Sequence, residues 1–375
     1  MNENKELPIT EVKPEYIIGD RISHRIALMR GILTLMVVNI HSINLVVHFQ
    51  TGNVSWGNSP WLATIEYLFS EVVSRTAVPA FFFISALLLY KKEFKWIDNL
   101  KKKIRSLVIP YIIVNSFWIA VYLILQSIPS LSTYFTMDGY IIRNWDIIGW
   151  LKGYGIFSSP LVAPLWFIRD LFVLNVLSKV IKRILNYAPT AFAILLLLFW
   201  ISPYNTHVFC LNKQALCFWS FGYICVHFNY NLEKLDRVRS PWLVSLYFIL
   251  VAMDVLFKES QLNWIIHNIA ILFGVVFWFV YGTTIQKDSI NRLLLLISEY
   301  SFGIYLFHQL TLNCINKVYA KLIPPSSISQ LFGYLVIPNI VIAGCVLFSI
   351  FLKKYAKRLY CVLFGKSFPI QGKLH

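Results

Sequence analysis

Charged and polar side chains interrupt the long apolar runs of this sequence, and their types and spacing could support chemistry. Arg30 and His41 stand eleven positions apart in the first run. On a helix they would share one face, separated by a rise of roughly 16 Å. An arginine can hold phosphate, and a histidine can accept a proton from a hydroxyl near neutral pH. We favour this reading over a snorkelling arginine and a histidine bonded to a neighbouring helix.

Two further groups occur in later apolar runs. Glu71 and Arg75 lie four positions apart, in the order that suits a helical ion pair. A structural ion pair and a substrate site explain them equally well. Trp166 and Arg169 lie in the stretch PLWFIRD. A ring beside a buried arginine suits a sugar, but a boundary tryptophan with a local Arg169–Asp170 pair explains the same residues.

Tyr305 and His308 are three positions apart in the stretch SFGIYLFHQ, with Ser301 on the same stripe. A polar side chain at mid-membrane depth faces the protein interior rather than lipid. We therefore expect His308 to join His41 at the site, although a hydrogen bond to a facing helix would also satisfy it.

Motifs of other enzyme classes are absent from the sequence. It contains no Walker A loop, GxGxxG, HExxH or GxSxG motif, which argues against ATP-driven transport and serine-hydrolase chemistry. The six cysteines include no CxxC pair, so no metal is expected.

The elements that must position these residues are membrane helices. The chain is 57% hydrophobic and 14% charged, with a mean hydropathy of +0.62, whereas soluble domains are roughly 45–50% apolar and about 25% charged. A span needs about 20 apolar residues. The predicted fold class is all-α, with about ten transmembrane helices over residues 25–48, 61–90, 107–128, 161–181, 187–202, 214–230, 241–257, 264–284, 295–322 and 331–352.

The distribution of positive charge supports this count. Alternate connecting segments and both ends hold 25 of the 34 Lys and Arg residues, whereas the opposite segments hold six. The positive-inside rule then places both termini in the cytoplasm. We predict a cytoplasmic tail at 1–24, a transmembrane domain at 25–352 and a basic cytoplasmic tail at 353–375. The net charge of +16 reflects topology, and no nucleic-acid partner is expected.

Four stretches together resemble the acyltransferase 3 family of integral-membrane O-acyltransferases. They are RGILTLMVVNIH, RTAVPAFFFIS, PLWFIRDLFVL and SFGIYLFH, and they follow the family order over most of the chain. The resemblance maps the functional Arg–ten–His signature of the family onto Arg30 and His41, and the second-helix arginine onto Arg75. Ser85-Ala86 departs from the Ser-Gly that is common in the family, so close backbone approach is not expected there.

The resemblance implies an acyl-CoA donor, most simply acetyl-CoA, used from the cytoplasm. It implies as acceptor a hydroxyl of a cell-envelope polysaccharide or its lipid-linked precursor, or sometimes another small molecule. Arg30 would bind the phosphates of the cofactor and His41 would act as general base. Substrate binding would fall to Glu71, Arg75, Trp166, Arg169, Tyr305 and His308. The expected location is a multi-pass position in a bacterial-type inner membrane, and the sequence leaves the oligomeric state open.

The same residues are also compatible with two other functions. An exporter of a glycan or lipid-linked sugar could line its path with the same intramembrane charges, but it would have no use for acyl-CoA. A structural or regulatory membrane subunit explains those charges least well.

Overall fold

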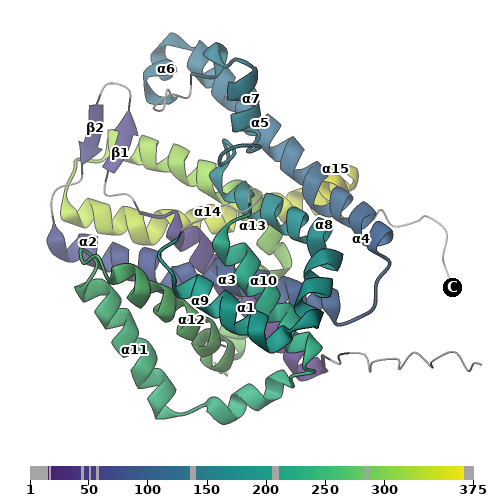
Figure 1. The fold of residues 1–375 in the computed structure, drawn as a ribbon. Coiled ribbons are helices and arrows are strands. Elements are labelled where there is room, and N and C mark those ends of the chain that lie inside the picture. The colour runs from purple at the N-terminus through teal and green to yellow at the C-terminus, as the bar shows by residue number, and fades with distance from the viewer. Residues whose placement is uncertain are drawn as a thin grey trace, which may run out of the picture.

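The computed structural model describes residues 16, 18–43, 46–49, 52–55, 59–135, 141–204, 211–282, 284 and 287–366. These residues form a helical bundle with one short hairpin (Figure 1), which confirms the predicted all-α class. The hairpin pairs β1 (Val46–Phe49) with β2 (Gly52–Ser55). The α-helices are α1 (Asp20–Ile40), α2 (Pro60–Glu66), α3 (Ala77–Tyr90), α4 (Trp96–Lys103), α5 (Ile109–Ser127), α6 (Pro129–Phe135), α7 (Ile147–Gly153), α8 (Trp166–Tyr187), α9 (Pro189–Ile201), α10 (Lys213–His227), α11 (Pro241–Leu256), α12 (Asn263–Tyr281), α13 (Asp288–Leu322), α14 (Ser327–Tyr355) and α15 (Lys357–Leu363).

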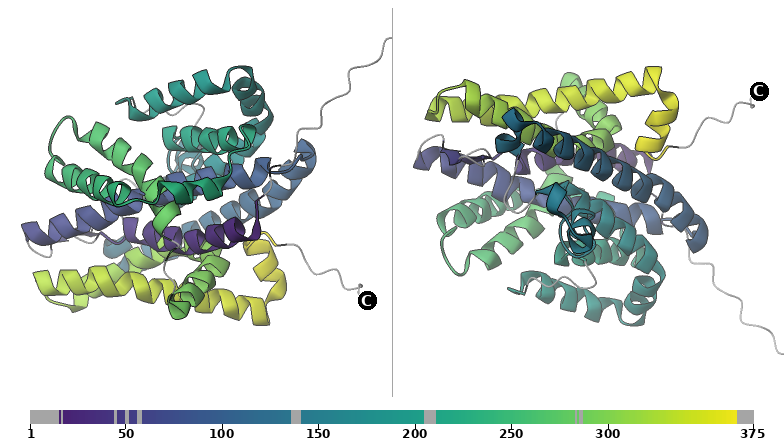
Figure 2. Two further views of the ribbon diagram at one scale, coloured as in Figure 1. Left: turned by 90° about the horizontal axis from the view of Figure 1, so that it is seen from below. Right: turned by 90° about the horizontal axis from the view of Figure 1, so that it is seen from above.

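Helix α1 lies in the interior of the bundle. It packs along α13, which in turn packs along α14, while α3 packs along α10 and α11 packs along α12. The C-terminal helices and the α11–α12 pair therefore lie on opposite sides of α1 (Figure 2). The start of α1 and helix α15 lie at the same end of the bundle (Figure 2). Buried apolar residues on α1, including Met29 and Leu33, form the core around it.

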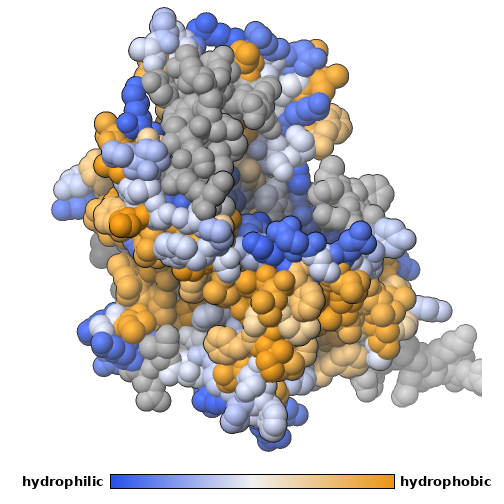
Figure 3. Space-filling model, turned by 90° about the vertical axis from the view of Figure 1, so that its left-hand side faces the viewer, coloured by the Kyte–Doolittle hydropathy of each residue, from blue (hydrophilic) through white to orange (hydrophobic). Residues whose placement is uncertain are grey.

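The protein is a multi-pass membrane protein. Within the described residues, five helices are long and apolar enough to cross a bilayer, and up to seven segments qualify if each of two bent pairs is one span. The five segments are Pro60–Tyr90, Trp96–Ser127, Asn263–Tyr281, Asp288–Leu322 and Ser327–Tyr355. Apolar side chains form a belt between polar borders (Figure 3), as lipid contact requires. The count of ten spans and the cytoplasmic termini stay predictions.

Several predicted segments differ from the observed helices. The run predicted at 25–48 is helical only to Ile40, because the N–H of His41 and the hydroxyl of Ser42 both donate to the Val38 carbonyl and close the last turn. The hairpin strand β1 follows instead. The predicted spans 161–181 and 187–202 form a helix pair that is bent by 111°. Pro189 at the start of α9 allows this bend, since α8 ends at Tyr187.

The second predicted span is continuous but not uniformly α-helical. A π-helix at Tyr67–Val73 and a 3₁₀ turn at Ser74–Thr76 precede α3. Pro79 cannot donate to the carbonyl of Arg75, four residues earlier, so the α-helical hydrogen-bond ladder must be interrupted there. The irregular turns therefore lie on the N-terminal side of Pro79. A second π-helix, Ile104–Val108, precedes Pro110 in the same way.

Candidate active site

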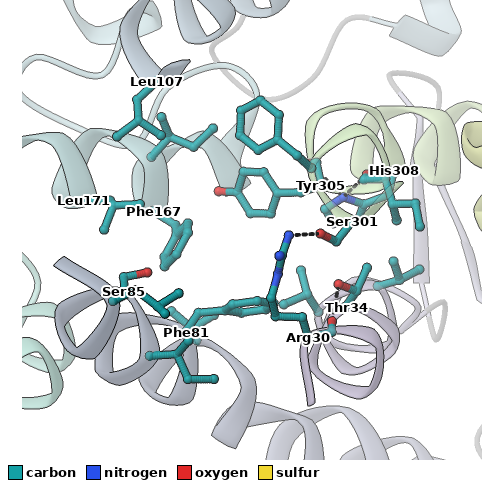
Figure 4. Close-up of a pocket in the computed structure, with 18 residues that line it drawn as sticks. Arg30, Thr34, Phe81, Ser85, Leu107, Phe167, Leu171, Ser301, Tyr305 and His308 are labelled. Atoms are coloured by element: carbon teal, nitrogen blue, oxygen red, sulfur yellow. Dashed lines mark hydrogen bonds between the residues drawn. The ribbon is translucent and has the colours of Figure 1, made fainter. Parts of the chain in front are cut away.

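A cavity of about 240 Å³ lies between α1, α3, α8 and α13. Its wall is mainly apolar, with side chains such as Phe81, Phe167 and Leu171 (Figure 4). Arginine, histidine and hydroxyl groups interrupt this wall mainly on one side, where α1 and α13 face each other (Figure 4). The polar lining residues are Arg30, Thr34, Ser85, Ser301, Tyr305 and His308.

Arg30 extends from α1 towards α13 (Figure 4). Its Nη2 donates to the Ser301 hydroxyl at 3.0 Å and lies 3.5 Å from the Ser298 carbonyl oxygen. The hydroxyl of Thr34, one turn further along α1, donates to the Arg30 carbonyl at 2.6 Å. The guanidinium carries five donors, so contact with Ser301 leaves it able to bind an anionic ligand.

Two histidines meet beside this cavity. The rings of His41 and His308 have centroids 5.2 Å apart and planes inclined by 48°. His308 is fully buried and lines the cavity. His41 is the C-cap residue of α1 and is not among the residues that line the cavity. The eleven-residue spacing on α1 therefore places Arg30 on the cavity wall and His41 beside the wall residue His308.

Tyr305 also lines the cavity, but its hydroxyl is already engaged. It donates a short hydrogen bond to the Pro164 carbonyl oxygen. This bond ties α13 to the turn that precedes α8, and the Tyr305 ring contacts Phe167 with centroids 5.6 Å apart. The tyrosine thus fixes the distance between two walls of the cavity.

Glu71 of the π-helix and Arg75 of the following 3₁₀ turn form an ion pair. The Arg75 Nη2 and Nε atoms lie 2.6 to 2.9 Å from the carboxylate oxygens of Glu71. Neither residue lines the cavity. The 3₁₀ turn is tied to the end of α1, because Asn39 donates to Ser74 at 3.1 Å. The pair therefore lies on the His41 side of the site.

Trp166 and Arg169 lie at the start of α8 but outside the set of lining residues. Nη1 of Arg169 donates to the carbonyls of Gly155 and Ser158 at 2.6 and 2.8 Å, and its Nη2 pairs with Asp170 at 3.0 Å. These contacts attach the loop before α8 to the helix. A role for Trp166 and Arg169 in substrate binding stays a prediction.

Sequence reasoning did not select six polar or aromatic wall residues as site residues: Thr34, Phe81, Ser85, Phe167, Ser301 and Phe302. Thr34 was detectable, since it stands one helical turn after Arg30. Ser301 was noted only as sharing a stripe with His308, and Phe167 directly follows Trp166 in the PLWFIRD stretch. Ser85 could not be identified as a site residue from the sequence, because a single serine in an apolar helix usually donates a hydrogen bond to a backbone carbonyl of the same helix.

Comparisons with known proteins identify a family for this chain. A family described as an acyltransferase domain matches residues 23–353. The succinoglycan biosynthesis protein ExoH of Rhizobium meliloti (strain 1021) is 28% identical over 224 residues, covering 59% of this chain and 58% of that protein. The chain thus spans a little over half the length of this curated relative. No solved structure gives a significant match.

Proposed function

This chain belongs to the acyltransferase family that matches it over residues 23–353, and from that premise we propose that it is an O-acyltransferase of a bacterial-type inner membrane. The match confirms the family resemblance seen in the sequence. The proposed reaction moves an acyl group, most simply acetyl from acetyl-CoA, to a hydroxyl of a cell-envelope polysaccharide or its lipid-linked precursor. The name of the relative, a succinoglycan biosynthesis protein, supports a polysaccharide acceptor.

One observation carries the proposal: Arg30 and His308 line one apolar cavity, with His41 against His308. Arg30 supplies positive charge for the phosphates or the thioester of the donor. The apolar wall excludes water, which would otherwise hydrolyse the thioester. His41 acts as general base on the acceptor hydroxyl.

The two substrates approach the histidines from different sides in this proposal. The donor occupies the cavity beside Arg30. The acceptor approaches His41 and the Glu71–Arg75 ion pair, whose side chains are 29% and 42% exposed. Trp166 and Arg169 support the acceptor through the loop that Arg169 holds in place.

The test is transfer of labelled acetyl-CoA by purified protein in nanodiscs to a panel of free and lipid-linked glycans. Label should appear on a glycan with the wild-type protein and not with His41→Ala, which should remain folded. A protein that neither binds acetyl-CoA saturably nor releases CoA would contradict the proposal. Glycan flux across vesicles would then test the exporter alternative.

A further inference from the structure

The inference concerns His308 and rests on the proposed acyl transfer. Its starting point is that His308 has a defined tautomer. Its Nδ1 atom lies 3.0 Å from the Ile304 carbonyl oxygen and 2.9 Å from the Tyr305 carbonyl oxygen. Carbonyl oxygens only accept hydrogen bonds, so Nδ1 must carry the hydrogen. In the neutral ring the lone pair therefore resides on Nε2.

Nε2 of His308 is buried and has no hydrogen-bond partner among the described residues. The neighbouring polar groups of the wall are engaged: Arg30 donates to Ser301, Thr34 donates to the Arg30 carbonyl, and Tyr305 donates to a carbonyl. An unpaired buried nitrogen destabilises the folded protein, and a proton or a ligand group that binds it would remove that cost.

The His41 ring packs against the His308 ring. The two rings are 5.2 Å apart between centroids, and a proton passes between two groups that lie within hydrogen-bond reach or share one bridging water. Within the described part of the chain, the wall residues other than His308 offer no imidazole to the cavity. A proton taken by His41 can therefore reach the cavity through Nε2 of His308.

We propose that His308 is the catalytic acid that protonates the departing CoA sulfur, using the proton that His41 removes from the acceptor hydroxyl. As the hydroxyl oxygen bonds to the thioester carbon, its proton passes to His41. When the tetrahedral intermediate collapses, the C–S bond breaks and its electron pair stays on sulfur. His41 returns its proton to Nε2 of His308, which delivers it to sulfur. Both histidines end neutral, and the products are the ester and CoA thiol.

The surroundings of the cavity explain why such an acid is needed. A thiolate expelled against apolar side chains would be a poorly solvated charge, which is costly in a low-dielectric site. Arg30 can offset part of that charge but cannot give up a proton. The carbonyls of Ile304 and Tyr305 hold the His308 ring in place, because both accept from Nδ1–H.

The test distinguishes the roles of the two ring nitrogens of His308. His308→Asn keeps an amide donor near the position of Nδ1 and removes Nε2, whereas His308→Gln places a non-basic amide near Nε2. His24→Gln is the matched control, since His24 is an exposed histidine on the same helix α1 as His41. Folding and saturable acetyl-CoA binding are measured for each variant before its activity.

Each variant is assayed with two donors and with the glycan that the wild-type protein modifies fastest. The donors are acetyl-CoA and the acetyl thioester of 5-thio-2-nitrobenzoate, whose thiol leaves as a stable anion. With acetyl-CoA, His308→Asn and His308→Gln should lose about 100-fold or more in kcat. With the activated thioester, both should come within about tenfold of wild type. His41→Gln should fail with both donors, and His24→Gln should match wild type.

Three activity results would contradict the proposed proton relay, in which the proton passes from His41 through His308 to the sulfur. They are full activity of His308→Asn with acetyl-CoA, an equal loss with both donors, and rescue of His41→Gln by the activated thioester. If neither His308 variant binds acetyl-CoA, the histidine is structural and the relay is wrong. Absence of transfer by the wild-type protein would instead remove the proposed function itself.

Discussion

Gly31 of α1 touches the main chain of Leu294 in α13. A Cβ atom at position 31 would lie 2.3 Å from the Leu294 carbonyl oxygen and 3.0 Å from its carbonyl carbon. Small residues allow such close helix packing in membranes. This contact sets the distance between the two helices that carry Arg30 and Ser301.

We expect Gly31→Ala to move α1 away from α13. Because the neighbour is rigid backbone, overpacking should cost about 1–3 kcal/mol in the free energy of unfolding and should weaken acetyl-CoA binding by displacing Arg30. Thermal unfolding in detergent and donor titration measure both effects. Gly344→Ala on α14 is the control, since nothing lies within 4 Å of a Cβ there. Equal behaviour of the two variants would show that the close contact does not position the site.

Arg30 should dominate affinity for the donor. We expect Arg30→Gln to raise the Kd of acetyl-CoA at least about tenfold, since hydrogen bonds to charged groups are worth about 1.5–3 kcal/mol. Ser301→Ala should have a smaller effect, because it removes the partner of Arg30 and leaves the charge. Isothermal titration measures the Kd.

Arg183→Gln controls for the loss of one positive charge, because Arg183 is exposed on α8 and does not line the cavity. Weakening by Arg183→Gln equal to that by Arg30→Gln would mean that net charge, rather than the cavity arginine, governs donor binding.

The sequence predicted the helical class because apolar runs of about 20 residues are decisive in a membrane protein. It could not place the end of α1 at Ile40, since the apolar pattern continues through Val47. The bend between α8 and α9 was also missed. A proline allows a change of direction, but the angle is set by packing against other helices.

The site was partly predictable for a related reason. Arg30, Tyr305 and His308 interrupt apolar runs, and such groups must face the protein interior, where the structure brings them to one cavity. The sequence suggested the Arg169–Asp170 pair, but it could not predict that Arg169 also holds the preceding loop, because those partners are backbone carbonyls. Backbone acceptors leave no signal in the residue types of that loop.

The Glu71–Arg75 ion pair offers a test of acceptor binding. We expect Arg75→Gln to raise the acceptor KM about tenfold, through loss of a charged hydrogen-bond donor, and to leave the Kd of acetyl-CoA unchanged. The free energy of unfolding should fall by less than about 1 kcal/mol, because both side chains are partly exposed. Steady-state kinetics with varied acceptor and varied donor separate these effects.

The charge-swapped double variant, Glu71→Arg with Arg75→Glu, separates structure from binding. It should recover stability by restoring the pair and should not recover the acceptor KM, because the positive charge has moved along the helix. A double variant with wild-type kinetics would mean that the pair acts only in packing.

Asp170 should be important for folding rather than for chemistry. Its carboxylate is fully buried, pairs with Arg169 at 3.0 Å and accepts from the Asn212 N–H at 2.9 Å. Asp170→Asn leaves the arginine without its counter-charge, so we expect a loss of about 3–5 kcal/mol in the free energy of unfolding. The residual folded fraction should bind acetyl-CoA with the wild-type Kd, because neither residue lines the cavity. Thermal unfolding and donor titration on the same preparation measure both quantities. A stable Asp170→Asn protein with a raised acceptor KM would instead place Arg169 and Asp170 in the acceptor site.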